Sequence, residues 1–426
     1  MKKNLRIGVI GLGQRGSDAV RVLSLLKGVE LAALCDLHPE RIALRQKWLK
    51  ENRRFTVPLE FSGPDGWKKL CGEAELDLVY DASPWPLHVP AAIRAMECGK
   101  DVATEVPAAF TVEDCWRLVE TSERTKRQCI QLENCVYGET ELLTERLVRE
   151  GFFGELKHAE CAYIHDLRQW CYQDFRMDET TYCRTGYWND WRLKWNAKHK
   201  GNQYPTHGLM PVCRYLGVNR GDRLDYLVSL ECDPIGFADY GRRRDTDPKR
   251  GRTKIAMGDM NTTLVKTAKG RSILIQHDIA SPRPYSRINL VSGTLGILKD
   301  YPLAVARSKN PGDPAHKWME KEELERLKKR YMHPLWREAG KYAKIVGGHG
   351  GMDFLMILRL CRALKRGEAF DQDVYDLATT CSVCELSERS VRNHSAPQEI
   401  PDFTRGKWKR RSPNEIGRAV ISSFGF

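Results

Sequence analysis

The sequence predicts an α/β protein in which an N-terminal, doubly wound parallel sheet is followed by a C-terminal α+β domain with an open, mainly antiparallel sheet. Three observations lead to this prediction. Apolar runs alternate with amphipathic helical stretches up to residue 150, a glycine-rich turn joins the first run to the first helix, and strand-like runs with hairpin turns dominate afterwards. Strand–helix alternation is typical of parallel sheets, whereas successive strands favour antiparallel pairing. A chain of 426 residues is also long enough for two domains.

The first half repeats a strand–helix pattern. Residues 4–36 give a strand, a glycine turn, an amphipathic helix and a second strand, which together make one βαβ unit. Thr111, with Glu113 soon after it, has the composition of a helix start. The further expected elements are a strand at 75–83, a helix at 86–100, a strand at 101–107, a helix at 111–127, a strand at 128–138 and a helix near 140–150.

The second half is richer in strands. Strand-like segments lie at 156–168, 223–232, 261–280 and 286–302, and helical patterns return at 352–368 and 373–393. We place the domain boundary between residues 138 and 155. Residues 1–145 are assigned to the first domain and 146–426 to the second, which ends in a helical segment. An open sheet face in the second domain would allow self-association, so a homo-oligomer is one expectation.

Charge and hydropathy exclude several classes of protein. The net charge of +13 comes partly from the basic stretches 240–254 and 405–411. Both stretches contain turn formers and neither has a nucleic-acid-binding motif, so a solvated loop and tail are favoured over contact with nucleic acid or an anionic glycan. No apolar stretch approaches the ~18 residues that cross a bilayer, and no signal-peptide pattern opens the chain. We expect a cytoplasmic protein, although a leader removed from a longer precursor would leave the same sequence.

The 14 cysteines are scattered through apolar surroundings, where free thiols pack as small hydrophobes. Such usage is typical of a reducing compartment. Cys381 and Cys384 are the only close pair. In a helical context they are two thiols one turn apart rather than half of a zinc site, because no second ligand pair accompanies them. We therefore expect no metal.

The glycine turn has the pattern of a dinucleotide site. Gly11, Gly13 and Gly16 follow a strand and open a helix, and Asp36 ends the next strand. In such a site the glycines allow a tight turn, close approach to the pyrophosphate and close packing of helix on strand. The N–H groups at the start of the helix face the anion. A carboxylate at position 36 would accept hydrogen bonds from the ribose hydroxyls and repel a 2′-phosphate, so NAD is favoured over NADP.

Polar and aromatic residues also follow later strands of the predicted sheet. They stand at the carboxyl edge, where ligands of such sheets bind. His88 opens a helix, and a neutral hydrogen-bonding role suits it better than a cationic one; a helix-start histidine facing water is the alternative. The residues are Ser83, Pro84, Trp85, His88, Glu105, Pro107 and Asn134.

The order GLGQRG, CD, ASPWPLH, ATEVP and ENCVYG resembles the glucose–fructose oxidoreductase/inositol dehydrogenase superfamily. This resemblance implies a Rossmann domain followed by an open-sheet domain. The superfamily's dehydrogenases usually have lysine where this chain has Val106. An aliphatic side chain can neither accept a proton nor polarise a ketone, so the ordinary dehydrogenase machinery is incomplete.

The second half resembles glycoside hydrolase family 109, whose members are NAD-dependent α-N-acetylgalactosaminidases. The motifs that carry the resemblance are ECAYIHDLR, DWRLKWN, GNQYPTHGL, SPRPYSRINLVSGTLG, HGGMDF and SAPQEIPDFTRGKWK. Members of that family also have TEVP at the position of the dehydrogenase lysine. The resemblance runs from Gly11 to about Trp408.

The family resemblance implies two sets of site residues. The cofactor contacts fall on Gln14, Arg15, Asp36, Trp85, Pro86, Leu87, His88, Glu105, Val106, Asn134 and Tyr204. The sugar contacts fall on Tyr163, Arg192, Tyr204, Pro205, Thr206, His207 and Tyr285. The aromatic-rich stretch 168–190 has the character of an insertion and is expected to alter the rim of the sugar pocket.

The resemblance also implies a redox-neutral glycosidase. Most glycosidases use two carboxylates, and NAD-dependent families are the exception. NAD⁺ would oxidise carbon 3 of the sugar, elimination would expel the group on carbon 1, and addition of water and return of the hydride would complete hydrolysis. NAD would therefore stay tightly bound and be recycled. The substrate would be a glycan or glycoside ending in N-acetylgalactosamine.

Three side chains are candidates to move protons. His207 is the first, for the carbon 3 hydroxyl, because imidazole accepts a proton near neutral pH. Tyr163 or Tyr285 would take the carbon 2 proton or assist the leaving group, aided by a neighbouring cation; Arg192, Arg283 and Arg287 are the possible cations. If these side chains move no protons, His207 would be a helix-start or core histidine, Tyr163 a core tyrosine and Tyr285 a loop tyrosine that covers the core.

Two rival functions remain. A sugar or cyclitol dehydrogenase would release NADH during turnover. A non-catalytic sensor on the same fold would not need the set Tyr163, Arg192, His207 and Tyr285.

Overall fold

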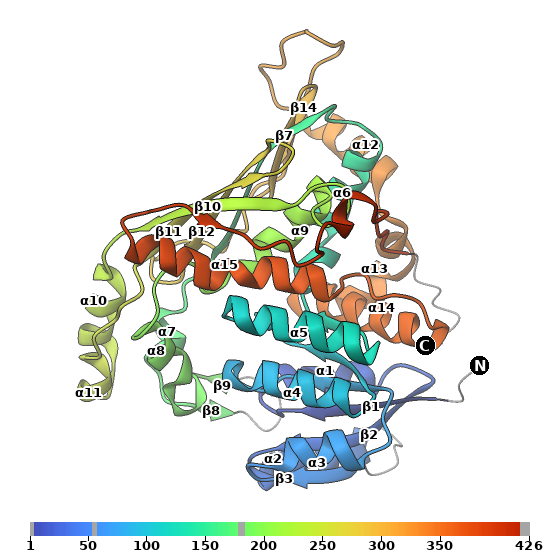
Figure 1. The fold of residues 1–426 in the computed structure, drawn as a ribbon, viewed down its shortest axis with the longest axis vertical. Helices are drawn as coiled ribbons and strands as arrows, with labels where there is room; N and C mark the ends of the chain where they lie inside the picture. Colours follow the sequence, from blue (N-terminus) through green and yellow to red (C-terminus); the bar gives the residue numbers. More distant parts are fainter. Residues whose placement is uncertain (1–3, 53–57, 178–183, 418–426) are drawn as a thin grey trace.

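The computed structural model describes residues 4–52, 58–177 and 184–417. Two sheets form its framework, with helices packed between and around them (Figure 1). Predicted and observed elements agree over most of the chain, and one of the differences, at the end of β6, lies beside the cavity described below.

The first sheet is parallel throughout, with strand order β3-β2-β1-β4-β5-β6, which confirms the doubly wound prediction. Thr111 caps its helix as predicted, since its side chain accepts a hydrogen bond from the Asp114 N–H. The strands are β1 (Leu5–Ile10), β2 (Val29–Asp36), β3 (Leu59–Ser62), β4 (Leu78–Asp81), β5 (Asp101–Thr104) and β6 (Cys129–Gln131). The helices are α1 (Gln14–Leu23), α2 (Pro39–Asn52), α3 (Gly66–Glu73), α4 (Trp85–Glu97) and α5 (Val112–Thr125).

The strand predicted at 128–138 is wrong beyond Gln131. The chain turns there into the 3-10 helix η1 (Asn134–Tyr137), because the Glu133 side chain accepts from the Cys135 N–H and caps it. Asn134, which lines the cavity, therefore sits on a tight turn rather than on a flat strand. Elements α2, β3 and α3 were not predicted.

The second sheet has eight strands in the order β15-β14-β13-β7-β12-β11-β10-β16. All neighbours are antiparallel except β7 and β12, so the mainly antiparallel prediction holds. The segment predicted at 286–302 divides into two strands. The strands are β7 (Leu156–Ile164), β10 (Leu224–Glu231), β11 (Met260–Thr267), β12 (Ser272–Asp278), β13 (Leu290–Gly293), β14 (Gly296–Lys299), β15 (Ala304–Arg307) and β16 (Gln398–Glu399).

The C-terminal helices return to the first sheet. Helix α14 (Met352–Arg366) shares a buried cluster with β1 and α1 through residues such as Phe354. Helix α15 (Val374–Arg392) lies along α5 (Figure 1), and its buried Cys381 belongs to the cluster that fills the space between α4 and α5. Cys384 lies one turn further along the same helix and is also a buried free thiol. The boundary at 145/146 stays a prediction. Buried residues of α14 and α15, near the end of the chain, belong to the hydrophobic clusters of the first sheet.

The basic stretch 240–254 is largely helical rather than the predicted loop, and most of its residues are exposed to solvent as expected. It forms the end of α10 (Ile235–Arg244) and the short α11 (Pro248–Gly251). Arg250 has only 9% of its side chain exposed and pairs with Asp245, Asp174 and Asp190. The tail is paired too, since Arg405 contacts Glu123.

The other elements surround these two layers. None of the described helices is long and apolar enough to cross a membrane. The elements are α6 (Glu139–Arg149), α7 (Arg168–Cys171), β8 (Arg176–Met177), β9 (Arg184–Thr185), η2 (Trp188–Asp190), α8 (Trp191–Asn196), α9 (Thr206–Leu216), α12 (Lys321–Tyr331), α13 (Pro334–Val346), η3 (His349–Gly351) and η4 (Lys407–Lys409).

Candidate active site

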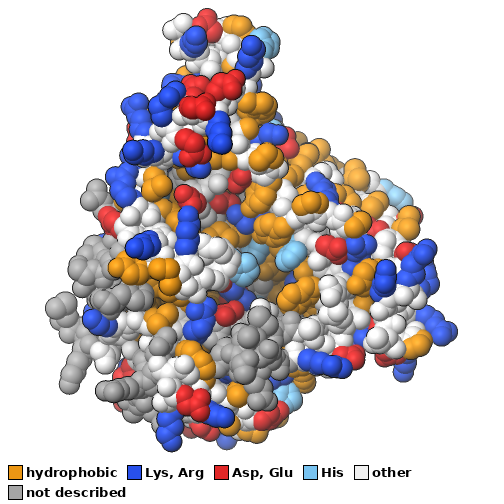
Figure 2. Space-filling model, turned by 180° about the vertical axis from the view of Figure 1, so that it is seen from behind, with side chains coloured by type: hydrophobic (Ala, Val, Ile, Leu, Met, Phe, Trp, Pro, Cys, Tyr) orange, Lys and Arg blue, Asp and Glu red, His pale blue; other side chains and the backbone are white. Residues whose placement is uncertain are grey.

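A cavity of ≈ 720 Å³ lies at the carboxyl edge of the first sheet and is lined from the other side by the end of β7 and by α8 and α9. Figure 2 shows a face of the molecule that is hollowed near its middle, with histidine side chains beside the hollow. Of the turn glycines and the residues that the family resemblance assigns to cofactor and sugar, only Gly16, Pro205 and Thr206 do not line the cavity; Pro107, expected at a strand end, does not line it either. Those that do are Gly11, Gly13, Gln14, Arg15, Asp36, Trp85, Pro86, Leu87, His88, Glu105, Val106, Asn134, Tyr163, Arg192, Tyr204, His207 and Tyr285.

The glycine turn has the shape that a pyrophosphate needs. Gly11 has φ +82°, and a Cβ there would lie 2.6 Å from the Ala82 carbonyl oxygen. A Cβ on Gly16 would lie 1.7 Å from the Gly11 oxygen, so α1 packs directly on the turn. A Cβ on Gly13 would meet nothing within 4 Å, which leaves open space in front of the N-terminus of α1. Anions bind at such helix starts.

Asp36 lines the cavity at the tip of β2. Its carboxylate accepts from the Leu12 N–H at 2.7 Å and from the His38 N–H at 3.0 Å, and Arg41 lies 3.5 Å away. These contacts fix the carboxylate at the tip of β2 and leave lone pairs for ribose hydroxyls.

His88 ties two strand-end loops together. Its ring nitrogens lie 2.9 Å from the Pro107 carbonyl oxygen and 2.8 Å from that of Ser83. A carbonyl oxygen only accepts, so a neutral His88 donates to one of the two and only an imidazolium donates to both. In either form His88 shapes the wall of the cavity. The Ser83 hydroxyl is buried and has no hydrogen-bond partner among the described residues, so it can serve a ligand.

Asp353, on α14, is surrounded by donors from three other parts of the chain. It accepts from Arg15 at 2.7 Å, from Asn134 Nδ2 at 2.6 Å and from His349 Nδ1 at 2.8 Å. Burial alone would raise the pKa of Asp353, but Arg15 and the His349 hydrogen bond hold it well below its usual range. An ionised carboxylate only accepts, so Asn134 must present its NH₂ to Asp353. Arg15 also contacts Glu105 at 3.0 Å.

These features fit a dinucleotide. The open space at Gly13, the carboxylate of Asp36 and the unpartnered Ser83 hydroxyl lie along one cavity. Its volume is within the ~300–1,000 Å³ usual for ligand sites. The residues present would thus hold NAD along the carboxyl edge.

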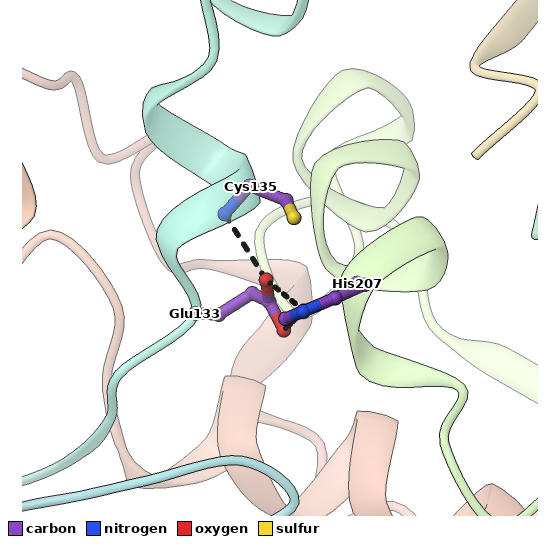
Figure 3. Close-up of side chains that lie close together, drawn as sticks. All are labelled: Glu133, Cys135 and His207. Atoms are coloured by element: carbon purple, nitrogen blue, oxygen red, sulfur yellow. Dashed lines mark hydrogen bonds and ion pairs between the residues drawn. The ribbon is translucent and has the colours of Figure 1, made fainter. Parts of the chain in front are cut away.

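The sequence analysis missed Glu133, which pairs with His207 (Figure 3). His207 Nδ1 lies 2.8 Å from Glu133 Oε1 and 3.0 Å from Oε2. Burial would raise the pKa of Glu133, but His207 and the Cys135 N–H hold it below its usual value. The ionised carboxylate accepts the Nδ1 hydrogen, so a neutral His207 keeps a lone pair on Nε2. A histidine in this arrangement can act as a general base.

Cys135 is the third member of this cluster. Ligand atoms of Glu133, Cys135 and His207 lie within 4.8 Å of one another, which is close enough to consider a metal. Burial raises the pKa of the Cys135 thiol well above its usual value, and the 2.8 Å contact between Glu133 and His207 is a hydrogen-bond distance. A hydrogen-bonded dyad describes these groups better than a metal site does.

Tyr163 lies between a cation and an imidazole. Its hydroxyl is 3.0 Å from His165 Nδ1. Burial raises the pKa of Tyr163, and the adjacent Arg192 opposes this rise. Burial and Arg192 lower the pKa of His165 to about 4, so that imidazole is neutral near pH 7.

Arg192 is a buried cation inside aromatic rings. Its guanidinium carbon lies 4.9 Å from the Trp85 ring centroid, 5.2 Å from that of Tyr204 and 5.6 Å from that of Tyr187. Its Nε has no hydrogen-bond partner among the described residues. A buried guanidinium with a free N–H can bind a ligand oxygen.

Tyr285 receives its own cation. Arg287 donates to its hydroxyl at 3.1 Å and to Glu141 at 3.0 Å. Of the arginines considered from the sequence, Arg192 thus serves Tyr163 and Arg287 serves Tyr285.

Several other lining residues were not predicted. His165 stands two positions after Tyr163, directly beyond the end of β7, and His349 lies in the glycine-rich GGHGG loop. Alternation along a strand could have indicated His165. Nothing local indicates that Glu133 meets His207, because 74 positions separate them in the chain.

Comparison with known proteins agrees with this geometry. Residues 137–410 match the family model "Glycosyl hydrolase 109, C-terminal domain", and residues 5–132 match "Oxidoreductase family, NAD-binding Rossmann fold". The chain is 44% identical over 412 residues to a protein of Shewanella oneidensis named alpha-N-acetylgalactosaminidase, with 96% of this chain and 87% of that one covered. It is 45% identical over 413 residues, with the same coverage, to a glycosyl hydrolase family 109 protein of Shewanella putrefaciens.

Solved structures share the fold. An NAD-binding oxidoreductase from Klebsiella pneumoniae matches with a TM-score of 0.70 at 17% identity, covering 94% of this chain and 100% of that one. A levoglucosan dehydrogenase in complex with NADH and L-sorbose matches with a TM-score of 0.70 at 16% identity and the same coverage. From the family match over most of its length, the chain belongs to the glycosyl hydrolase 109 family, as an enzyme built on an NAD-binding Rossmann fold.

Proposed function

We propose that this enzyme hydrolyses terminal α-N-acetylgalactosaminides by a redox-neutral route in which NAD stays bound and is recycled. The observation that carries the proposal is that His207, which is hydrogen-bonded to the buried Glu133, lines the same cavity as the dinucleotide-binding turn. A family relative that carries the name alpha-N-acetylgalactosaminidase supports the substrate class.

Bound NAD⁺ would supply a reversible oxidation of carbon 3 of the sugar, which acidifies the carbon 2 proton and allows the group on carbon 1 to leave. His207 Nε2 would accept the proton of the carbon 3 hydroxyl, because Glu133 stabilises the imidazolium that forms. The same imidazolium would return the proton when the hydroxyl is restored. The dyad thus holds one proton through the cycle.

Tyr163 is the better placed of the two tyrosines to take the carbon 2 proton. Its phenol lies against Arg192, which would stabilise a developing phenolate, and His165 orients the hydroxyl by accepting its hydrogen bond. Tyr285 is held by Arg287 and lines the opening of the cavity with over a third of its surface exposed. We assign Tyr285 to sugar binding and to the leaving group.

A net dehydrogenase remains the competing function, since the fold neighbours include one. Val106 stands at the cavity wall with an aliphatic side chain. It cannot move the hydroxyl proton as a lysine would, and this favours the hydrolase.

The test incubates the protein with p-nitrophenyl α-N-acetylgalactosaminide and follows nitrophenol and NADH absorbance together. Nitrophenol release without accumulating NADH, with deuterium entering carbon 2 in deuterated water, is the expected result. NADH accumulating in proportion to substrate would overturn the proposal. The β-anomer and the corresponding glucosaminide serve as controls for the sugar and the anomer, and His207→Ala should abolish turnover while NAD stays bound.

A further inference from the structure

The aromatic-rich segment around residues 168–190 reaches the end of the cavity where Asp36 lies. Phe175 and Trp188 line the cavity together with Asp36, His38 and Arg41. The sequence analysis expected this segment at the sugar rim. Its described aromatic residues instead divide, since Tyr187 contacts Arg192 near the sugar residues while Phe175 and Trp188 lie over the end of β2.

Arg41 contacts both rings and also the carboxylate of Asp36, the residue predicted to bind the ribose. Its guanidinium carbon lies 5.3 Å from the Phe175 ring centroid and 5.9 Å from that of Trp188. The same guanidinium is 3.5 Å from Asp36. Only the Arg41 side chain therefore separates the two rings from the Asp36 carboxylate that would bind the ribose.

Trp188 also packs on the loop that follows β2. Its ring meets His38 edge to face, with centroids 5.1 Å apart and planes at 71°. His38 Nε2 is buried and has no hydrogen-bond partner among the described residues. An unpartnered ring nitrogen beside a cavity is a ready contact for a polar ligand edge.

A buried arginine fixes both ends of this segment. Arg250 donates to the Tyr172 carbonyl at 3.3 Å and to Asp174 at 3.1 Å, before Phe175, and to Asp190 at 3.3 Å, after Trp188. Asp245 holds the same guanidinium at 2.7 Å. The segment that carries the two aromatic rings is therefore held in place by Arg250 of α11, a helix that lies between β10 and β11 of the second sheet in the chain.

We propose that Phe175 and Trp188 form an aromatic clamp over the adenosine half of the bound dinucleotide, which keeps NAD on the enzyme between turnovers. Any nucleobase packs favourably on the face of an aromatic ring. An enzyme that returns its hydride in every cycle has no reason to release the cofactor. This function of the clamp rests on the proposed redox-neutral hydrolysis, whereas its binding role does not.

The test compares wild type with Phe175→Ala/Trp188→Ala. Expected results are NAD lost during gel filtration, NAD dissociation faster by ~10- to 100-fold, and weaker binding of ADP-ribose by the same factor, with nicotinamide mononucleotide binding unchanged. Trp318→Ala is the matched control, because Trp318 is exposed, contacts Lys299 and does not line the cavity. Phe175→Leu/Trp188→Leu keeps apolar volume and should show the same selectivity if the alanine variant does not fold.

Two outcomes would overturn the clamp. Unchanged NAD dissociation means that the rings do not hold the cofactor, and equal weakening of ADP-ribose and nicotinamide mononucleotide means general damage. Failure of wild type to hydrolyse the glycoside, with the nucleotide results as expected, would remove the proposed function and leave the clamp standing.

Discussion

Glu133 controls which nitrogen of His207 faces the cavity. The carboxylate lies at 2.8 Å from Nδ1 and is completely buried, so it cannot exchange this contact for water. Because His207 is the second residue of α9, the ring direction is set by the dyad and by the helix together.

Glu133→Gln should lower kcat by about 10²- to 10⁴-fold, because an amide cannot stabilise the imidazolium. NAD should stay bound. The check is nitrophenol release together with NAD content. Glu145→Gln is the control, since Glu145 is a buried carboxylate paired with Arg214 outside the cavity, and it should keep kcat.

The same variant has a signature in stability. The pKa of Glu133 is lowered in the folded protein, so the ionised group stabilises the fold above its unfolded pKa of about 4.3, and this contribution is lost as pH falls through the lower folded value. Unfolding measured from pH 7 to pH 3 should therefore show the largest gap between wild type and Glu133→Gln above pH 5. A gap that widens below pH 4 would contradict this assignment.

Sequence reasoning located the local parts of this site. Gly11, Gly13 and Asp36 lie within one βαβ unit, so their spacing alone brings them to one edge. Glu133 with His207, and Asp353 with Arg15, meet only through the tertiary fold. Their spacing along the chain says nothing about such contacts.

At the scale of elements, α9 must lie directly on β7 to place His207. A Cβ on Gly208 would be 2.6 Å from the Ala162 nitrogen and 2.7 Å from its oxygen. Backbone atoms cannot move aside as a flexible side chain does. Glycine at this position therefore lets the helix approach the strand.

Gly208→Ala should destabilise the protein by about 1–3 kcal/mol through overpacking and also lower kcat, because His207 is the neighbouring residue. Gly72→Ala on α3 is the control. A Cβ there meets only the Arg94 guanidinium at 3.3 Å, and alanine is the better helix former. The check is to measure thermal unfolding and kcat for both variants. If Gly208→Ala and Gly72→Ala behave alike, close packing is not the reason for glycine at position 208.

Elements with clear periodicity were predictable, and those set by side-chain contacts were not. The βαβ repeat and the hairpin of β11 and β12 follow from apolar patterns. The end of β6 depends on the Glu133 cap, and the fold of 240–254 depends on Arg250 meeting three carboxylates. Composition alone predicted that this stretch is exposed to solvent but did not predict its helices.

At the scale of the molecule, the second sheet has one covered and one open face. Helices α9 and α15 pack on the covered side. On the other side Leu230, Tyr226 and Leu264 are 59%, 42% and 49% exposed. The register places Val228 beside Leu264 and Leu264 beside Leu274, so the apolar side chains form a continuous row across three strands.

A second copy of the chain is the occupant that we predict for this face. Large exposed apolar rows usually mark an interface, and symmetric pairing of identical sheets covers both copies at once. Sedimentation velocity should therefore show a dimer or larger species for wild type, and Leu264→Asp should give an active monomer because a buried carboxylate at the interface is unfavourable. Ile345→Asp, on the exposed side of α13 with Ile345 73% exposed, should leave the assembly intact. A monomeric wild type at micromolar concentration would refute the interface, whereas an inactive Leu264→Asp monomer would mean that pairing of the sheets also shapes the cavity wall at the end of β7.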